Sequence, residues 1–222
     1  MNKLLNPNSR VIAFLETCFD LALLNCLFLT FSLPLLSIGA SLTALYRSII
    51  DVMDGQRGQV TQRFYRYFKA DAKQSTIFFC LSSLFILFLV MNISLLDKMT
   101  GILYLFWSMS LVVMGFYVAL VTFCAYYFLA RYDNSLMGMV RAVFQLFSYE
   151  KGKIIVMLLP YLLVYAFFVS SSVGLFTAFY FLTFGGVSFL VVWKVLFFKK
   201  LLKPYERPVS YTHLTLPTIY SV

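Results

Sequence analysis

The chain alternates long apolar runs with short polar segments. Four runs carry almost no charge and are long enough for membrane-spanning helices, which need about 20 apolar residues to cross a hydrocarbon layer of about 30 Å. They occupy residues 76–96, 101–130, 154–171 and 174–198. The pattern therefore predicts an all-α fold, a polytopic transmembrane helical bundle.

Residues 12–46 form a further apolar region, which is too long for one untilted span and is interrupted near Pro34 and Gly39. One interpretation is a single kinked span at about 18–46, which gives five spans. The alternative is a helical hairpin within residues 18–50, bent at 32–34, which gives six. We take five spans as the prediction and keep the hairpin as the alternative.

The basic residues predict an orientation. Residues 47–75 carry six of the eighteen Lys and Arg residues, and the positive-inside rule places this segment in the cytoplasm under either span count. Five spans put the amino terminus outside, whereas six put both termini inside. The charge bias by itself slightly favours six.

Two of the expected cytoplasmic segments have amphipathic patterns. In residues 61–73 basic side chains recur at helical spacing beside aromatic ones, and residues 134–148 carry one apolar face. We expect interfacial helices that contact the anionic headgroups of the lipid bilayer. The sharper alternative is a docking surface for a cytoplasmic partner, made by Arg63, Arg66, Lys69 and Lys73.

Composition supports the membrane interpretation. Hydrophobic residues make up 61% of the chain and charged residues 12%, against about 45–50% and 25% in soluble domains. The four cysteines have no CxxC spacing, so we interpret them as small buried hydrophobes. The net charge of +9 comes from residues between the apolar runs, and we therefore expect no nucleic-acid partner.

Motifs of common catalytic sites are missing from the sequence. It contains no GxxxxGK[ST], GxGxxG or HExxH pattern and a single histidine, His213. We predict a protein that is not an enzyme and has no cofactor, metal or catalytic residues.

The polar residues inside the first apolar region are the candidates for intramembrane chemistry. Glu16 and Asp20 are four residues apart and share a helical face, and Asn25 follows one turn later. Ionisable groups within a span are functional candidates, although carboxylates also favour the start of a helix. Near the other end of the chain, Trp193 and Lys194 precede more basic residues and are typical of an interfacial anchor.

The last segment differs from the rest. Residues 209–222 are polar and rich in Thr, and VSYTHLTLPT can be back-translated into a transposon-end sequencing adapter. We interpret this segment as adapter read-through rather than native sequence, and His213 with it. Residues 1–208 are then a single transmembrane domain.

Three segments together resemble a known family. They are NCLFLTFSLPLLSIGASLTALY at residues 25–46, the following MDGQRG, and RFYRYFK at 63–69, with Asn6 and Pro7 upstream. This pattern resembles the YesL family, also called domain of unknown function 624 (DUF624). Its members are small bacterial integral membrane proteins of unknown function that are often encoded beside carbohydrate-uptake transporters and their sensors. The resemblance implies a multi-pass protein of the bacterial inner membrane. It also implies an accessory or regulatory role in carbohydrate uptake, with a transporter or sensor as partner.

The segment around Pro34 keeps a second function open. Gly39, Thr43 and their small neighbours allow another helix to approach closely, and Pro34 frees a backbone carbonyl that Ser or Thr can satisfy. Tight packing explains this pattern, but transporters also contain broken helices of this kind, so a small secondary transporter is the alternative. A sugar-importer permease subunit is a weaker one, because Phe147 stands where its loop motif requires glycine.

Overall fold

The computed structural model describes residues 10–56, 58–132 and 135–204, and within these ranges the chain is helical without strands. The all-α prediction is confirmed. The elements are α1 (Arg10–Phe31), η1 (Leu35–Ser37), α2 (Ile38–Met53), α3 (Val60–Leu96), α4 (Gly101–Arg131), α5 (Leu136–Val169), α6 (Ser172–Phe181), η2 (Leu182–Gly186) and α7 (Val187–Leu202). The Asn6-Pro7 segment, His213 and the proposed adapter at 209–222 lie outside the described residues.

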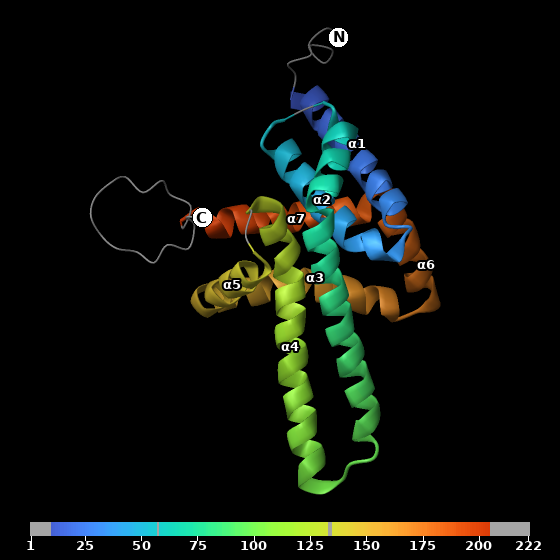
Figure 1. Ribbon diagram of the computed structural model, residues 1–222. Helices are drawn as coiled ribbons and strands as arrows, with labels where there is room; N and C mark the ends of the chain where they lie inside the picture. Colours follow the sequence, from blue (N-terminus) through green and yellow to red (C-terminus); the bar gives the residue numbers. More distant parts are fainter. Residues whose placement is uncertain (1–9, 57, 133–134, 205–222) are drawn as a thin grey trace, which may run out of the picture.

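The first apolar region is a helical hairpin, so the prediction of one kinked span at 18–46 is wrong. Helix α1 ends at Phe31, and α2 turns back along it after η1 (Figure 1). Pro34 has an extended backbone, with ψ of 113°, and lacks the N–H that would continue a helix. The Ser37 hydroxyl lies 2.5 Å from the Phe31 carbonyl oxygen and 2.7 Å from that of Pro34. A serine hydroxyl therefore satisfies carbonyl oxygens at this break.

Five segments of the described chain are long and apolar enough to cross a membrane. They are Val11–Phe31, Leu35–Met53, Val60–Leu96, Gly101–Arg131 and Ser172–Leu202. The number agrees with the five spans predicted, but the set differs, because the hairpin supplies two members. The expected span at 154–171 falls mostly within α5.

The two amphipathic segments are the beginnings of longer helices. Residues 61–73 continue without a break into the apolar part of α3, whose 37 residues extend for about 55 Å. Residues 136–148 form the first part of α5, which kinks at Glu150 (φ −127°, ψ 31°). Residues 61–73 are not a separate helix, because no glycine or proline interrupts the chain before the apolar part of α3. In α5 the kink at Glu150, two residues before Gly152, separates residues 136–148 from the apolar part that follows.

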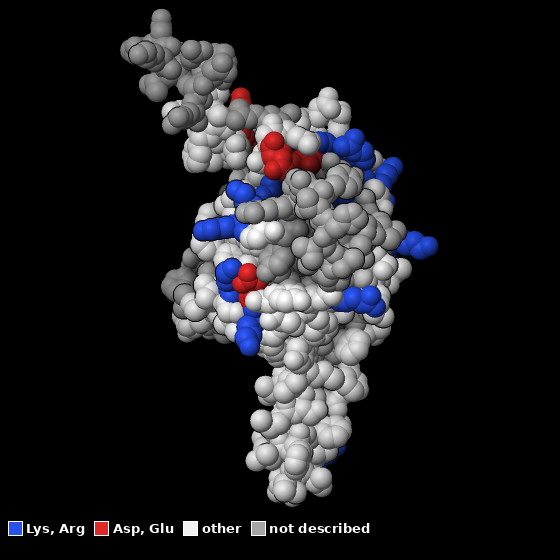
Figure 2. Space-filling model, turned by 90° about the vertical axis from the view of Figure 1, so that its left-hand side faces the viewer, with Lys and Arg blue, Asp and Glu red and all other residues white. Residues whose placement is uncertain are grey.

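The core lies at one end of a long α3–α4 hairpin. In α4 every residue from Cys124 to Ala130 is buried, and Tyr127 stacks on Phe198 of α7 with ring centroids 4.5 Å apart. The far part of the hairpin protrudes from the body (Figure 1), and its large apolar side chains are exposed. Figure 2 shows charged side chains gathered on the body and almost none on this face of the hairpin. Such a surface suits a lipid environment.

Candidate functional site

Arg47 joins three helices at the charged end of the molecule. Its Nη1 atom donates to both carboxylate oxygens of Asp71 on α3, at 3.0 and 3.2 Å, and its Nε donates to the carbonyl oxygen of Ala130 on α4 at 3.0 Å. The two charged side chains are only 21% and 18% exposed. A guanidinium that contacts a carboxylate and a carbonyl together fixes α2, α3 and α4 relative to one another.

A polar cavity of about 430 Å³ lies beside this contact. The hydroxyl of Tyr67 donates to the Asp51 carboxylate at 2.6 Å, and the guanidinium carbons of Arg47 and Arg66 each lie 5.3 Å from the centre of the Tyr67 ring. The remaining walls come mainly from the end of α4. The cavity is lined by Arg47, Ile50, Asp51, Tyr67, Ala130, Arg131 and Tyr132.

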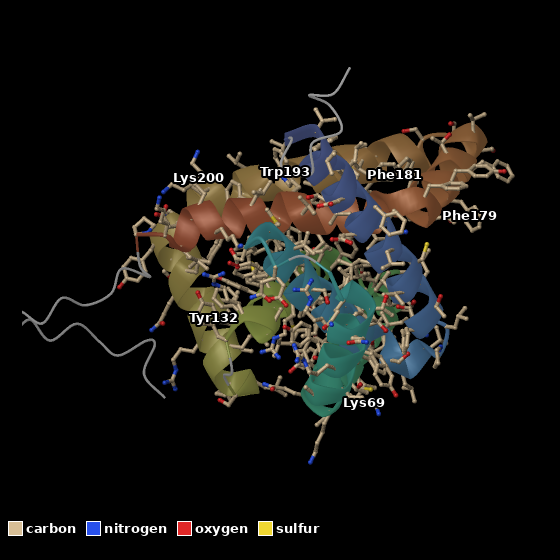
Figure 3. The ribbon with its side chains drawn as sticks, turned by 90° about the horizontal axis from the view of Figure 1, so that it is seen from above. Lys69, Tyr132, Phe179, Phe181, Trp193 and Lys200 are labelled. Carbon is tan, nitrogen blue, oxygen red and sulfur yellow. The ribbon has the colours of Figure 1, made fainter. Side chains whose placement is uncertain are left out.

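The four basic residues predicted as a docking surface lie on the first turns of α3. Arg66, Lys69 and Lys73 are exposed, and Figure 3 shows Lys69 projecting away from the body. Arg63 differs, because its guanidinium donates to the backbone and side-chain oxygens of Gln56 at 2.8 and 3.2 Å. Arg63 therefore holds the loop before α3 in place.

The apolar side of the same turns packs onto the protein. Phe64 is fully buried, and its ring centroid lies 5.6 Å from that of Phe31 on α1, while Phe68 lies 5.0 Å from Phe31. These rings contact α1 of the α1–α2 hairpin, and the basic side chains are therefore left as the outer face of α3.

A second cavity of about 430 Å³ lies within the apolar body and contains one ammonium group. Lys194 of α7 is only 4% exposed. Its Nζ donates to the Phe123 carbonyl, and it lies 3.8 Å from the centre of the Phe123 ring and 5.2 Å from that of Tyr46. Among the described residues no carboxylate pairs with it. The interpretation of Lys194 as an interfacial anchor is therefore wrong, although Trp193 is 46% exposed, as an anchor would be.

Asn25 holds a break between α6 and α7. The break is η2, where Gly185 has a φ of 127°. The Asn25 amide nitrogen donates to the carbonyl oxygens of Leu182 and Thr183 at 3.0 and 2.9 Å, and its oxygen accepts from the backbone N–H of Ser188 at 3.2 Å. These three hydrogen bonds use both the N–H donors and the oxygen acceptor of the amide to bridge the break, so Asn25 has a structural role here.

Gly39 and Thr43 lie at the contact between α2 and α3. A Cβ atom at Gly39 would lie 2.5 Å from the backbone oxygen of Ser75 and 2.7 Å from Cβ of Phe79. The hydroxyls of Thr43 and Ser75 are 2.8 Å apart and buried. The small residues therefore serve close helix packing, and Pro34 lies in the connection between α1 and η1.

The carboxylates predicted as intramembrane candidates lie away from both cavities. Glu16 is exposed and Asp20 is half-buried, one turn apart on α1. Neither lines the two cavities described above. Among the residues that the structure describes, no group of three or more His, Cys, Asp or Glu side chains is placed to hold a metal ion.

The fold and its surface define a class of protein. Among the described residues, five apolar helical segments of spanning length, with exposed apolar side chains around them, define a multi-pass helical membrane protein. Residues 21–93 match the model of the family described as "Protein of unknown function, DUF624", which confirms the family resemblance seen in the sequence. No curated protein and no solved structure matches the chain.

Proposed function

We propose that this chain is a non-catalytic accessory or regulatory protein of carbohydrate uptake, located in the bacterial inner membrane, and that it acts by docking a cytoplasmic or membrane partner on its basic face. The basic face consists of Arg66, Lys69 and Lys73 on the first turns of α3. The role in carbohydrate uptake and the location rest on the family resemblance. The choice of the basic face rests on geometry.

One observation carries this choice: the apolar side of the basic turns is already covered by protein. Phe64 is fully buried, and Phe31 packs on Phe64 and Phe68. A helix that lies in a leaflet needs an apolar face directed at lipid, and here Tyr65 is the main aromatic left exposed. This favours docking of an acidic protein surface over anchoring to anionic headgroups.

Charged contacts in the body support the basic face as a platform. Arg47 and Asp71 tie α3 to α2 and α4, and Lys199 of α7 pairs with Asp54 at 2.6 Å. A preorganised surface loses little conformational entropy when a partner binds. The platform therefore suits a protein partner such as a carbohydrate transporter subunit or its sensor.

Site-specific photo-crosslinking tests this proposal in native membranes. A benzophenone amino acid at Lys69 should form a crosslink to a transporter subunit or sensor, identified by mass spectrometry. The same probe at Lys98, beyond the other end of α3, should not. Changing Arg66 and Lys73 to Glu should abolish the crosslink from position 69, because the acidic partner is then repelled. Crosslinks to lipid alone would instead support anchoring and contradict docking.

A small secondary transporter is the second candidate, and the α6–α7 break favours it. Transporters bind substrates at interrupted helices near the middle of the bilayer, and η2 interrupts a stretch of spanning length between Ser172 and Leu202. Purified protein in liposomes that moves a sugar or an ion down its gradient would establish this candidate. The leading proposal expects no flux above that of empty liposomes.

A further inference from the structure

The cavity around Lys194 contains an electrostatic imbalance that the proposed function does not explain. A buried ammonium is expensive to desolvate unless an anion or several dipoles compensate it. Here the compensation comes from one carbonyl oxygen and two aromatic rings, those of Phe123 and Tyr46. Around the cavity, no described residue contributes a carboxylate.

The rest of the cavity is apolar and reaches the lipid-facing surface. Helices α2, α3 and α4 contribute the other walls, with Leu42, Leu89 and Val118 among them. Ile86 and Ala119 also line it and are exposed, so the cavity opens on the side of the α3 and α4 spans. Its volume of about 430 Å³ is within the range of about 300–1,000 Å³ for small-molecule sites.

Two phenol groups lie at the same cavity as the ammonium. Tyr46 and Tyr126 both line it and are almost completely buried, at 4% and 5% exposed. Phenol hydroxyls donate hydrogen bonds, and together with Lys194 they supply donors for an acidic group. Lys194, Tyr46 and Tyr126 belong to three different helices, and the apolar walls extend from them.

We propose that this cavity binds an amphipathic anion from the bilayer, a single acidic headgroup on a hydrocarbon chain, as in a fatty acid. Lys194 binds the acidic headgroup, and the apolar walls contain the chain. A sugar does not fit this lining, because its hydroxyls would face apolar side chains. A neutral hydrocarbon does not fit it either, because it would leave the charge of Lys194 without a compensating anion. The site is separate from the basic face on α3, and its occupancy does not depend on docking there.

A photoactivatable fatty acid tests the site on the purified full chain in nanodiscs of neutral lipid. The probe is a diazirine-bearing hexadecanoic acid, and the matched probe is the alcohol of the same chain. Labelled peptides are mapped by mass spectrometry. The acid should label residues around the cavity in α3 and α4 about tenfold more than the alcohol does, because only the acid pairs with Lys194.

Two pairs of variants test the charge of Lys194 and the volume of the cavity separately. Lys194→Met keeps an unbranched side chain of similar length and should reduce labelling by the acid about tenfold, whereas Lys200→Met, exposed and farther along α7, should not. Gly115→Leu should also reduce labelling, because Gly115 lines the cavity and a Cβ there meets nothing closer than 4.0 Å. Gly152→Leu, whose Cβ would meet no atom within 4 Å, is its control.

Equal labelling by the acid and the alcohol in the unaltered protein would overturn the proposal without any variant. So would labelling that Lys194→Met and Gly115→Leu both leave unchanged. Displacement of the probe by acetate as effectively as by dodecanoate would show a site for small free anions and would overturn the role of the chain. Displacement by dodecanoate alone would support it.

Discussion

At the scale of single residues, Asn25 replaces hydrogen bonds that the α6–α7 break removes from the helix. A leucine at this position would leave the Ser188 N–H and the carbonyls of Leu182 and Thr183 without their present partner. Unsatisfied buried polar groups cost about 1–3 kcal/mol each in proteins, and side-chain hydrogen bonds in membranes average less.

We therefore predict that Asn25→Leu lowers the free energy of unfolding in detergent by about 1–3 kcal/mol, seen as a lower melting temperature. Asn92→Leu is the matched control. Asn92 is also buried, but its amide bonds only the Phe88 carbonyl of its own helix. Equal losses for the two variants would contradict a specific role of Asn25 at the break.

Gly39 is the residue where the absence of a side chain decides how two helices pack. Alanine at most helix positions is more stable than glycine by about 1 kcal/mol. At Gly39, however, the added Cβ would overlap the backbone oxygen of Ser75 at 2.5 Å. Backbone atoms cannot move aside as the end of a long side chain can.

Gly39→Ala should therefore destabilise the protein by about 1–3 kcal/mol. Gly115→Ala should be neutral or stabilising, because its Cβ would meet only a Leu89 methyl at 4.0 Å. Thermal unfolding of both variants in the same detergent measures the difference. An equal gain in stability at both positions would show that α2 and α3 are not in close contact at Gly39.

At the scale of helices, the Arg47–Asp71 pair holds the charged end together. Arg47→Met would remove the guanidinium that donates to both carboxylate oxygens of Asp71, which is 18% exposed. Removing one member of a buried pair costs about 3–5 kcal/mol, and we expect less here because both groups retain some contact with water.

We predict that Arg47→Met and Asp71→Leu each lower the melting temperature, and that the double variant loses less than the sum of the two. A thermodynamic cycle on the four proteins measures this coupling. Arg47→Lys should also be destabilising, because a single ammonium cannot contact the Asp71 carboxylate and the Ala130 carbonyl together, as the Nη1 and Nε atoms of the guanidinium do. Strict additivity of the two losses would mean that the pair contributes nothing to the joining of α2 and α3.

The sequence predicted the helices better than the contacts between them. The break at Pro34 and the close packing at Gly39 were predictable, because the first is determined within one helical turn and the second by residue size. Asp71 was not predictable as the partner of Arg47, because 24 residues and a loop separate them. Lys194 was misinterpreted for a related reason. Its basic neighbours in sequence, Lys199 and Lys200, suggested an interface, whereas residues of α2 and α4, Tyr46 and Phe123 among them, cover it in the fold.

At the scale of the whole molecule, the charged body and the uncharged α3–α4 hairpin define an orientation. We predict that residues 47–75 face the cytoplasm, because they carry six of the eighteen basic residues. In a cysteine-free background, Gln59→Cys should resist an impermeant thiol reagent on intact cells and react after permeabilisation. Lys98→Cys, in the turn after α3, should react on intact cells. The opposite pattern would reverse the orientation.

The length of α3 has a mechanical consequence. A continuous helix of about 55 Å is stiff over its whole length, so the basic turns at one end and the apolar turns at the other move as one lever. The body contacts this helix at Phe64, at the Arg47–Asp71 pair and near Gly39, all in its first half, and holds it there. A tilt of the body in the membrane would then move Lys69 and the tip that carries Lys98 together, in opposite directions.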